Sequence, residues 1–302
     1  MQPDSTSHGP GVPAAPVASR PFHFVAWDGG CLFIGRRGGI VPVHAHYAIQ
    51  IAFGAEPGIR FRAGASETWT EYAGAVIPSR HPHTMDVTRV SANVVLFVEP
   101  ETREGRALAE RWLQRGIAAI PPDVFTELAP PLFAAAFDEG SAVAVERAAR
   151  QVVHALTGGV QPAVVTDARI VRAVAHIKGH LDQPLTLDDV ADVACLSPSR
   201  FRHLFVEQTG VGLRPYLLWR RFLRVWELLS AGGSLSAAAH AAGFADAAHL
   251  SRTSRSMFGF APSAMQMAGP LPRDRGVSAG DARYAAPDQP LRSLPGRPAG
   301  LP

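Results

Sequence analysis

Residues 185–210 decide the fold, and they read LTLDDVADVACLSPSRFRHLFVEQTG. Thr186 and Asp189 stand three residues apart in the pattern of a helix capping box, and apolar residues follow at helical spacing. Ser197 and Pro198 then begin a second helix, because serine accepts from the first free N–H groups and proline fits the first helical position. The closing glycine can end this helix. The segment therefore predicts two helices joined by a tight turn.

The second of these helices has one apolar stripe and one polar face. Phe201, Leu204 and Phe205 fall on the stripe, which leaves the opposite face turned outward. The outward side chains include Ser199, Arg200, Arg202 and His203. Because arginine bonds guanine bidentately and the others reach bases or phosphates, this face suits the major groove of DNA.

The same pattern recurs nearer the C-terminus. Residues 235–242 carry apolar residues at helical spacing, a Gly-Phe turn follows, and Asp246 can cap a second helix that ends at Gly259. Between the two units, Pro215 opens a predicted connecting helix. Its apolar stripe consists of Leu218, Phe222, Val225 and Leu229, which lie at i, i+4, i+7 and i+11. One rigid helix would therefore hold both outward-facing helices.

Together these features resemble the DNA-binding domain of the AraC/XylS family of bacterial transcription regulators. The resemblance rests on Leu187, Ala191 through Ser197, Phe201 to Phe205, Gly210, Pro215, Gly243-Phe244, Asp246, Leu250-Ser251-Arg252 and Phe258-Gly259-Phe260-Ala261-Pro262. In that family the two recognition helices enter successive major grooves on one face of the duplex. The resemblance implies a double helix-turn-helix domain over residues 167–267 that binds double-stranded DNA.

The resemblance also implies which side chains read bases. In the first recognition helix these are Ser199, Arg202 and His203, with Arg200 beside them. In the second they are Ala247, Ala248 and Arg252. Because two alanines offer little beyond methyl contacts, we expect Arg252 to carry most of the discrimination in that half.

A further group of side chains is assigned to the DNA backbone, where it positions the protein without reading bases. Its members are Ser251, Arg255 and the connecting-helix arginines Arg220, Arg221 and Arg224. The second unit departs from the family pattern at Ala238 and Ser254, where larger side chains are usual. Loss of two large side chains from one small core would destabilise this unit by up to several kcal/mol unless neighbours such as Trp226, His249 or Met257 fill the space.

Composition favours a soluble protein with two domains. The 302 residues are 47% hydrophobic, with a formal net charge of only +3, so any attraction to nucleic acid must be local. Cys31 and Cys195 fall in different predicted domains, so we expect no disulfide and a reducing, cytoplasmic location. Neither a signal peptide nor an apolar run of membrane-spanning length is recognisable, so we expect no membrane contact.

Residues 20–100 predict a β-domain, which gives the whole chain an α+β fold class. Short runs typical of strands cover residues 22–27, 31–34, 46–53, 59–62, 68–70, 74–77 and 93–97. Several short strands at this spacing favour a barrel or jelly roll. AraC-type sensor domains commonly have such a barrel.

Two histidine clusters in this segment resemble the two cupin motifs. His44 and His46 are expected to share one strand face, with Gln50 and His83 as neighbours. Metal-binding cupins usually have a carboxylate where this chain has Gln50, and a neutral amide is a poor ligand. We therefore expect these four side chains to line an effector pocket, with no metal and no cofactor. The alternative is a metal-dependent cupin enzyme fused to a DNA-binding module.

Residues 101–158 predict a helical extension of three helices, near 108–113, 124–137 and 143–156, the second interrupted by Pro130-Pro131. In the AraC/XylS family this region often supplies the dimer contact, and the third helix is our candidate for a homodimer. Packing against the barrel explains its apolar stripe equally well. The remaining segments are a disordered N-terminus over residues 1–19, a linker over 159–166 and a disordered tail over 268–302.

The sequence thus predicts a one-component transcription regulator that is not an enzyme. Its barrel would sense an unidentified small molecule or promote dimerisation, and its helix-turn-helix units would bind a promoter site. A protein that merely compacts DNA is a further alternative, which differs in showing no preferred site.

Overall fold

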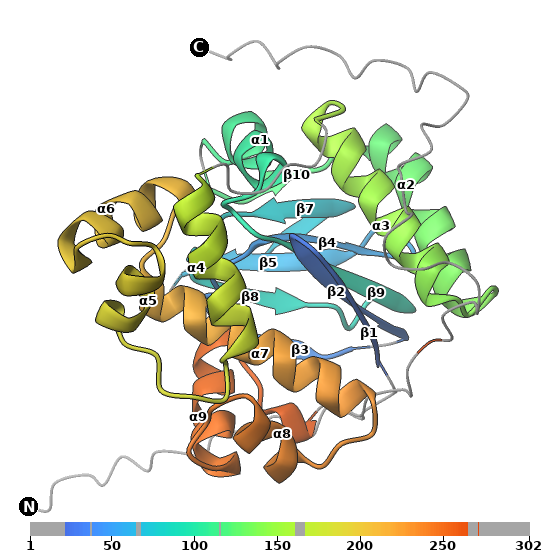
Figure 1. Ribbon diagram of the computed structural model, residues 1–302. Coiled ribbons are helices and arrows are strands. Elements are labelled where there is room, and N and C mark those ends of the chain that lie inside the picture. The colour runs from blue at the N-terminus through green and yellow to red at the C-terminus, as the bar shows by residue number, and fades with distance from the viewer. Residues whose placement is uncertain are drawn as a thin grey trace, which may run out of the picture.

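The computed structural model describes residues 22–36, 38–64, 68–114, 116–160, 167–264 and 271. Within them, β-strands fill the N-terminal part and helices follow, which confirms the α+β class (Figure 1). The predicted disorder over residues 1–19, most of the predicted linker and nearly all of the predicted tail lie outside the described residues. None of the helices in the described part is both long and apolar enough to cross a bilayer.

Two antiparallel sheets form the N-terminal part. One has the strand order β1, β2, β9, β4, β7, β10, and the other has the order β3, β8, β5, β6. The strands are β1 (Phe22–Trp27), β2 (Gly30–Arg36), β3 (Ile40–His44), β4 (Ile49–Gly54), β5 (Ile59–Ala63), β6 (Thr70–Tyr72), β7 (Gly74–Ile77), β8 (His83–Asp86), β9 (Ala92–Val98) and β10 (Ala118–Ala119). The short strands β3, β8 and β10 were not predicted from the sequence.

The two faces of the larger sheet belong to different cores, because side chains alternate along each strand. Leu32 lies opposite Leu96, which lies opposite Ile51, and all three pack in the core that includes helices α2 and α3. Cys31 lies opposite Phe97 on the other face, and both pack in a core formed mainly by the C-terminal helices. The sheet therefore joins the two halves of the chain.

Three helices cover one side of the sheets: α1 (Arg103–Trp112), α2 (Pro122–Phe137) and α3 (Ala142–Thr157) (Figure 1). The predicted interruption of the second is wrong, because α2 runs through both Pro130 and Pro131. Proline normally breaks a helix interior by removing a hydrogen bond and crowding the preceding turn. Here Ala129 and Leu132 on either side are buried, so packing against the sheet offsets that penalty.

The apolar stripe of α3 is buried within the chain itself. Its members are between 0% and 6% exposed: Val145, Ala149, Val152, Val153 and Leu156. All of them belong to the core shared with α2 and the sheet. Packing against the N-terminal domain therefore accounts for the stripe, and it is not free to form a dimer contact.

The C-terminal part consists of helices that confirm the predicted units. They are α4 (Ala168–Gly179), α5 (Leu187–Val193), α6 (Pro198–Thr209), α7 (Leu213–Ser230), α8 (Leu235–Ala241) and α9 (Ala247–Phe258), followed by a short 3₁₀ turn, Pro262–Ala264. Helix α7 begins two residues before Pro215, the predicted start. Helices α6 and α9 lie on the side of the molecule away from α2 and α3 (Figure 1).

The helical part docks tightly on the larger sheet. Phe33 contacts Trp226 with ring centroids 5.1 Å apart, and Phe97 contacts Trp219 at 5.5 Å. Phe97 also lies 6.2 Å from Phe258, so α7 and the end of α9 share one aromatic core with the sheet. The sequence predicted a linker between the two parts but not this docking. Because of the docking, the N-terminal part supports both helix-turn-helix units.

Candidate nucleic-acid interface

The first helix-turn-helix unit is held by local hydrogen bonds. The backbone N–H of Thr186 donates to the Asp189 carboxylate at 2.8 Å, and the Asp189 N–H donates to the Thr186 hydroxyl at 3.2 Å. The turn before α6 uses a left-handed residue, Cys195, with φ 54°, and the Ser197 hydroxyl then caps α6. Gly210 ends the helix with φ 70°. These contacts confirm the predicted caps and fix where α6 points.

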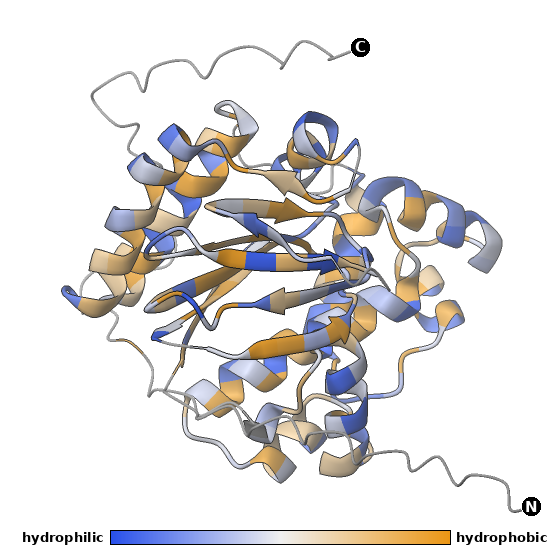
Figure 2. Ribbon diagram, turned by 180° about the vertical axis from the view of Figure 1, so that it is seen from behind, coloured by the Kyte–Doolittle hydropathy of each residue, from blue (hydrophilic) through white to orange (hydrophobic). Residues whose placement is uncertain are grey.

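Helix α6 turns its polar residues outward. Phe201 and Phe205 are buried at 0% and 1% exposure, which confirms the predicted apolar stripe. The four predicted DNA-facing residues are all exposed: Ser199, Arg200, Arg202 and His203. The helix projects from the body of the molecule and is largely hydrophilic (Figure 2). The structure thus brings these four side chains together on one accessible face.

The second unit repeats the arrangement around α9. The Asp246 carboxylate accepts from the His249 N–H at 2.6 Å, which caps the helix, and Leu250 is fully buried beneath it. Of the predicted DNA-facing residues, Ala247 is partly exposed, and Ala248, Arg252 and Arg255 are exposed. Helix α9 therefore presents a smaller but accessible face, with two arginines on it.

Small residues at two core positions of this unit are compensated by neighbours. Ala238 is 1% exposed and Ser254 is 0% exposed, so neither site opens to solvent. The Ser254 hydroxyl donates to the Phe260 carbonyl at 2.8 Å, which satisfies its polar group. Trp226 contacts Phe258 and Phe260, both with ring centroids 6.2 Å away. Trp226 and Ala238 belong to the same hydrophobic core.

The prediction that Arg220 contacts DNA phosphates is wrong. This arginine is 8% exposed, and its Nη1 lies 2.7 Å from Oε1 of Glu99, a residue that is itself 1% exposed. Its Nε donates to the Tyr216 hydroxyl at 3.0 Å. The prediction from helical periodicity assumed that only one face of α7 is buried, whereas packing against the sheet buries a second face. Arg220 therefore ties α7 to the N-terminal part.

The other two connecting-helix arginines differ in accessibility. Arg221 is partly buried, and its Nη2 donates to the Gln183 carbonyl at 3.1 Å. Arg224 is exposed and pairs with Glu227 at 3.3 Å on the same helix. Only Arg224 is well placed for a phosphate contact without rearrangement.

Sequence reasoning missed a buried polar cluster beside Arg220. Glu101 is 3% exposed, and the Tyr47 hydroxyl donates to its carboxylate. Burial, together with the nearby Glu99 carboxylate, raises the pKa of Glu101 to about 8. The run Glu99-Pro100-Glu101 directly after a buried strand was the available signal, because two acidic residues there need partners when they are buried.

The four predicted effector-pocket residues do come together. His44, His46, Gln50 and His83 are 7%, 2%, 1% and 0% exposed. His44 lies opposite His83 across β3 and β8, whereas His46 lies in the loop before β4 rather than on a strand. The predicted shared strand face is therefore wrong in detail, because the chain turns after His44, yet both rings still meet.

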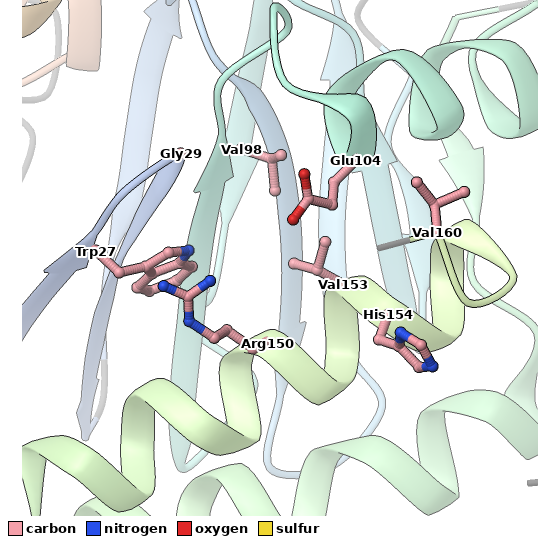
Figure 3. Close-up of a pocket in the computed structure, with 8 residues that line it drawn as sticks. All are labelled: Trp27, Gly29, Val98, Glu104, Arg150, Val153, His154 and Val160. Atoms are coloured by element: carbon pink, nitrogen blue, oxygen red, sulfur yellow. The ribbon is translucent and has the colours of Figure 1, made fainter. Parts of the chain in front are cut away.

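A surface pocket lies elsewhere in the N-terminal part, between the β1–β2 turn, the start of α1 and the end of α3 (Figure 3). It is lined by Trp27, Gly29, Val98, Glu104, Arg150, Val153, His154 and Val160. The guanidinium of Arg150 lies 5.7 Å from the Trp27 ring and 3.0 Å from Glu146. None of the predicted effector residues lines this pocket.

The chain has two helix-turn-helix units joined by one connecting helix, and the second helix of each unit exposes arginine. These features define the class: a double helix-turn-helix protein. Residues 190–268 match a family model described as a helix-turn-helix domain. Regulatory protein PocR of Salmonella typhimurium is 29% identical over 99 residues, which cover 32% of this chain. The arabinose operon regulatory protein of the same organism is 32% identical over 102 residues, also 32% of this chain. The C-terminal domain is thus of the AraC type, which confirms the resemblance.

The similarity to these relatives covers only part of each protein, because the chain spans 33% and 35% of their lengths. The whole fold is nevertheless similar to a solved structure, an apo ToxT variant from Vibrio cholerae. It has a TM-score of 0.52 and 11% identity, covering 79% of this chain and 97% of that chain. The combination of a sheet-rich N-terminal domain with a double helix-turn-helix domain therefore occurs in a solved protein.

Proposed function

We propose that this protein is a sequence-specific DNA-binding transcription regulator of AraC/XylS type. The observation that carries the proposal is the pair of exposed recognition helices, α6 with Arg202 and α9 with Arg252, held by one docked helix α7. Both lie on the same side of the molecule, away from α2 and α3 (Figure 1). Helices supported in this way can enter successive major grooves of one duplex.

The two recognition helices are assigned unequal roles. On α6, Ser199, Arg202 and His203 read bases, with Arg200 beside them. On α9, Ala247 and Ala248 contribute only small contacts, so Arg252 carries the discrimination and Arg255 holds a phosphate. The first half of the DNA site is then read more stringently than the second.

We assign control of this activity to the N-terminal domain, with an effector bound near His44, His46, Gln50 and His83. The shared aromatic core supports this role, because a change around Phe97 reaches α7 directly. The protein acts in the cytoplasm, as a homodimer or a monomer, and is not an enzyme.

Arg202→Ala is expected to weaken binding to the specific site by about 1–3 kcal/mol, roughly 5- to 150-fold, while leaving non-specific affinity largely unchanged. The reason is that a bidentate contact to guanine is lost without removing a phosphate contact. The site is first obtained by sequencing genomic fragments that the purified protein enriches. Affinities are then measured by fluorescence anisotropy on that site and on scrambled DNA over a range of salt concentrations.

Arg255→Ala is the matched control on the same surface. Because Arg255 is assigned to a phosphate, its loss should lower the affinity for the specific site and for scrambled DNA about equally. It should also reduce the slope of log affinity against log salt by about one. If Arg202→Ala lowers the affinity for both DNAs equally, then Arg202 contacts a phosphate and not a base. If no fragment is enriched over random sequence, the protein is a DNA-compacting protein and the proposal fails.

A further inference from the structure

The three buried histidines of the N-terminal domain form a compact cluster. One ring nitrogen from each of His44, His46 and His83 lies within 4.8 Å of the others. The ring centroids of His44 and His83 are 4.3 Å apart, and that of His46 lies 5.3 Å from His83. Three imidazoles are rarely gathered in a protein interior without a polar partner or an ion between them.

A backbone carbonyl oxygen faces Nδ1 of each of the three rings. The Nδ1 atoms of His44, His46 and His83 each lie 2.8 Å from a carbonyl oxygen, those of Pro42, Ala48 and His81. A neutral ring bonded in this way carries its hydrogen on Nδ1 and leaves a lone pair on Nε2. A carbonyl that fixes the second ring nitrogen is the usual support of a metal-binding histidine.

Two of the Nε2 atoms lack a suitable hydrogen-bond partner. Nε2 of His83 is buried without one. Nε2 of His46 lies 2.7 Å from Oε1 of Gln50, although its Nδ1 already faces the Ala48 carbonyl, so a neutral ring has one hydrogen for two acceptors. Burial lowers the pKa of His46 to about 3 and that of His83 to about 2, which keeps both rings neutral.

We propose that His44, His46 and His83 bind a divalent transition-metal ion of the Zn²⁺ or Co²⁺ class, with the Gln50 amide oxygen as a weak fourth ligand, and that this ion is the effector. Imidazole nitrogens select such metals over Mg²⁺ or Ca²⁺. Tetrahedral Zn²⁺ with bonds of about 2.0–2.1 Å needs ligand atoms roughly 3.3 Å apart. The ring nitrogens, which lie within 4.8 Å of one another, would therefore approach, whereas Nε2 of His46 and Oε1 of Gln50, now 2.7 Å apart, would separate. A cation between Nε2 of His46 and Oε1 of Gln50 also removes their mutual repulsion.

The proposed site is linked to the DNA-binding domain directly through Gly259 and indirectly through Phe97. Its regulatory role rests on the proposed function. Gly259, which ends α9 with φ 77°, lies against Pro42 and His44, since a Cβ built on it would be 2.8 Å from the Pro42 carbonyl and 3.3 Å from His44 Nδ1. The His46 ring lies 4.8 Å from Phe97, which contacts Trp219. Ring movements on metal binding therefore reach both α9 and α7.

Metal binding is tested on the full-length, tag-free chain with Co²⁺, by equilibrium dialysis and by the visible absorption of four-coordinate cobalt. We expect one Co²⁺ per chain, displaced by Zn²⁺. Losing an outer-shell partner alone weakens metal binding about 10–100-fold, so His83→Ala should weaken it at least as much. Circular dichroism checks that this variant folds.

His180→Ala is the matched control, because His176 near the end of α4 and His180 directly after it stack with ring centroids 4.1 Å apart and offer a pair for adventitious metal. This variant should keep the cobalt spectrum. Cobalt bound equally by the His83→Ala chain, or lost from the His180→Ala chain, overturns the site.

Gln50→Glu gives a test in the opposite direction, because a carboxylate is a better fourth ligand than an amide. It should bind Co²⁺ more tightly than the natural chain and gain more thermal stability from the ion. Weaker binding in this variant would remove Gln50 from the ligand set and contradict the proposed geometry.

The regulatory role is measured separately as the affinity for the enriched DNA fragment with and without Zn²⁺. Coupling between sites is typically about 5- to 150-fold, and we expect a change in that range that disappears in the His83→Ala chain. Stoichiometric metal with unchanged DNA affinity overturns the effector role. Stoichiometric metal without any preferred DNA fragment leaves the site intact and refutes the proposed function instead.

Discussion

Arg220→Met is expected to lower the free energy of unfolding by about 3–5 kcal/mol, as is usual when one partner of a buried ion pair is removed. The Arg220 guanidinium is the cation paired with Glu99 at 2.7 Å, and methionine would leave that carboxylate at 1% exposure without a counter-charge. The indole N–H of Trp219 also donates to Glu99, at 3.4 Å, but a neutral donor does not replace the positive charge. Urea unfolding followed by circular dichroism measures the change.

The control is Arg224→Met, one turn further along α7. Arg224 and Glu227 are each 47% exposed, so their pair should contribute no more than about 1 kcal/mol. A double variant, Glu99→Gln with Arg220→Met, should recover part of the loss because no buried charge remains unpaired. If the two single variants on α7 destabilise equally, then Arg220 acts through packing and the ion pair is not what holds the domains together.

The burial of Arg220 was not predictable from the periodicity of α7. The predicted apolar stripe included Leu218 and Leu229, which are only partly buried, while Trp219 and Trp226 are 1% exposed. A helix buried on two faces has no single stripe, and its second partner lies in a strand more than a hundred residues earlier. Periodicity within a helix carries no information about that partner.

The helix-turn-helix units were predictable because their signals are local. Thr186, Ser197 and Asp246 each accept a hydrogen bond from an N–H within three residues, so their function as caps depends on neighbours in sequence. Glycines that adopt positive φ close the two recognition helices in the same way. The exposure of Arg202 and Arg252 was predictable from the ends of α6 and α9 together with the apolar stripe of each helix.

The N-terminal domain was predictable as a β-fold but not in its pairing. Strands β3 and β8 contain histidine, proline and aspartate, which weakened the strand pattern, and their pairing depends on contacts distant in sequence. The gathering of His44, His46 and His83 was nevertheless expected from the resemblance to the cupin motifs. What spacing could not show is the orientation of each ring by a backbone carbonyl, which is the main support for a metal site.

A pH dependence centred on Glu101 is the second large expected effect. Because burial raises its pKa to about 8 from an ordinary value near 4.5, the folded chain keeps a proton that the unfolded chain loses between these two pH values. The stabilisation is complete below pH 4.5 and is lost as the pH rises through 8. The free energy of unfolding should therefore fall by up to about 1.4 kcal/mol per pH unit in that range.

The measurement is clearest between about pH 7.5 and 8, where the histidines of the unfolded chain have lost most of their protons. Below this window the buried histidines, whose pKa values are lowered from 6.5, give an opposite dependence. Above it, ionisation of Cys31 in the unfolded chain begins to contribute, because burial raises the pKa of this thiol in the folded chain. Within the window, urea unfolding at closely spaced pH values isolates Glu101.

Glu101→Gln should remove this slope, because glutamine resembles the protonated acid and still accepts from the Tyr47 hydroxyl. The variant should equal the natural chain at about pH 4 and exceed it in stability at pH 8. Glu110→Gln, an exposed substitution on α1, controls for the lost charge and should keep the natural slope. A slope that survives in Glu101→Gln would mean that another group between the domains holds the proton, and that Glu101 is ionised beside Arg220.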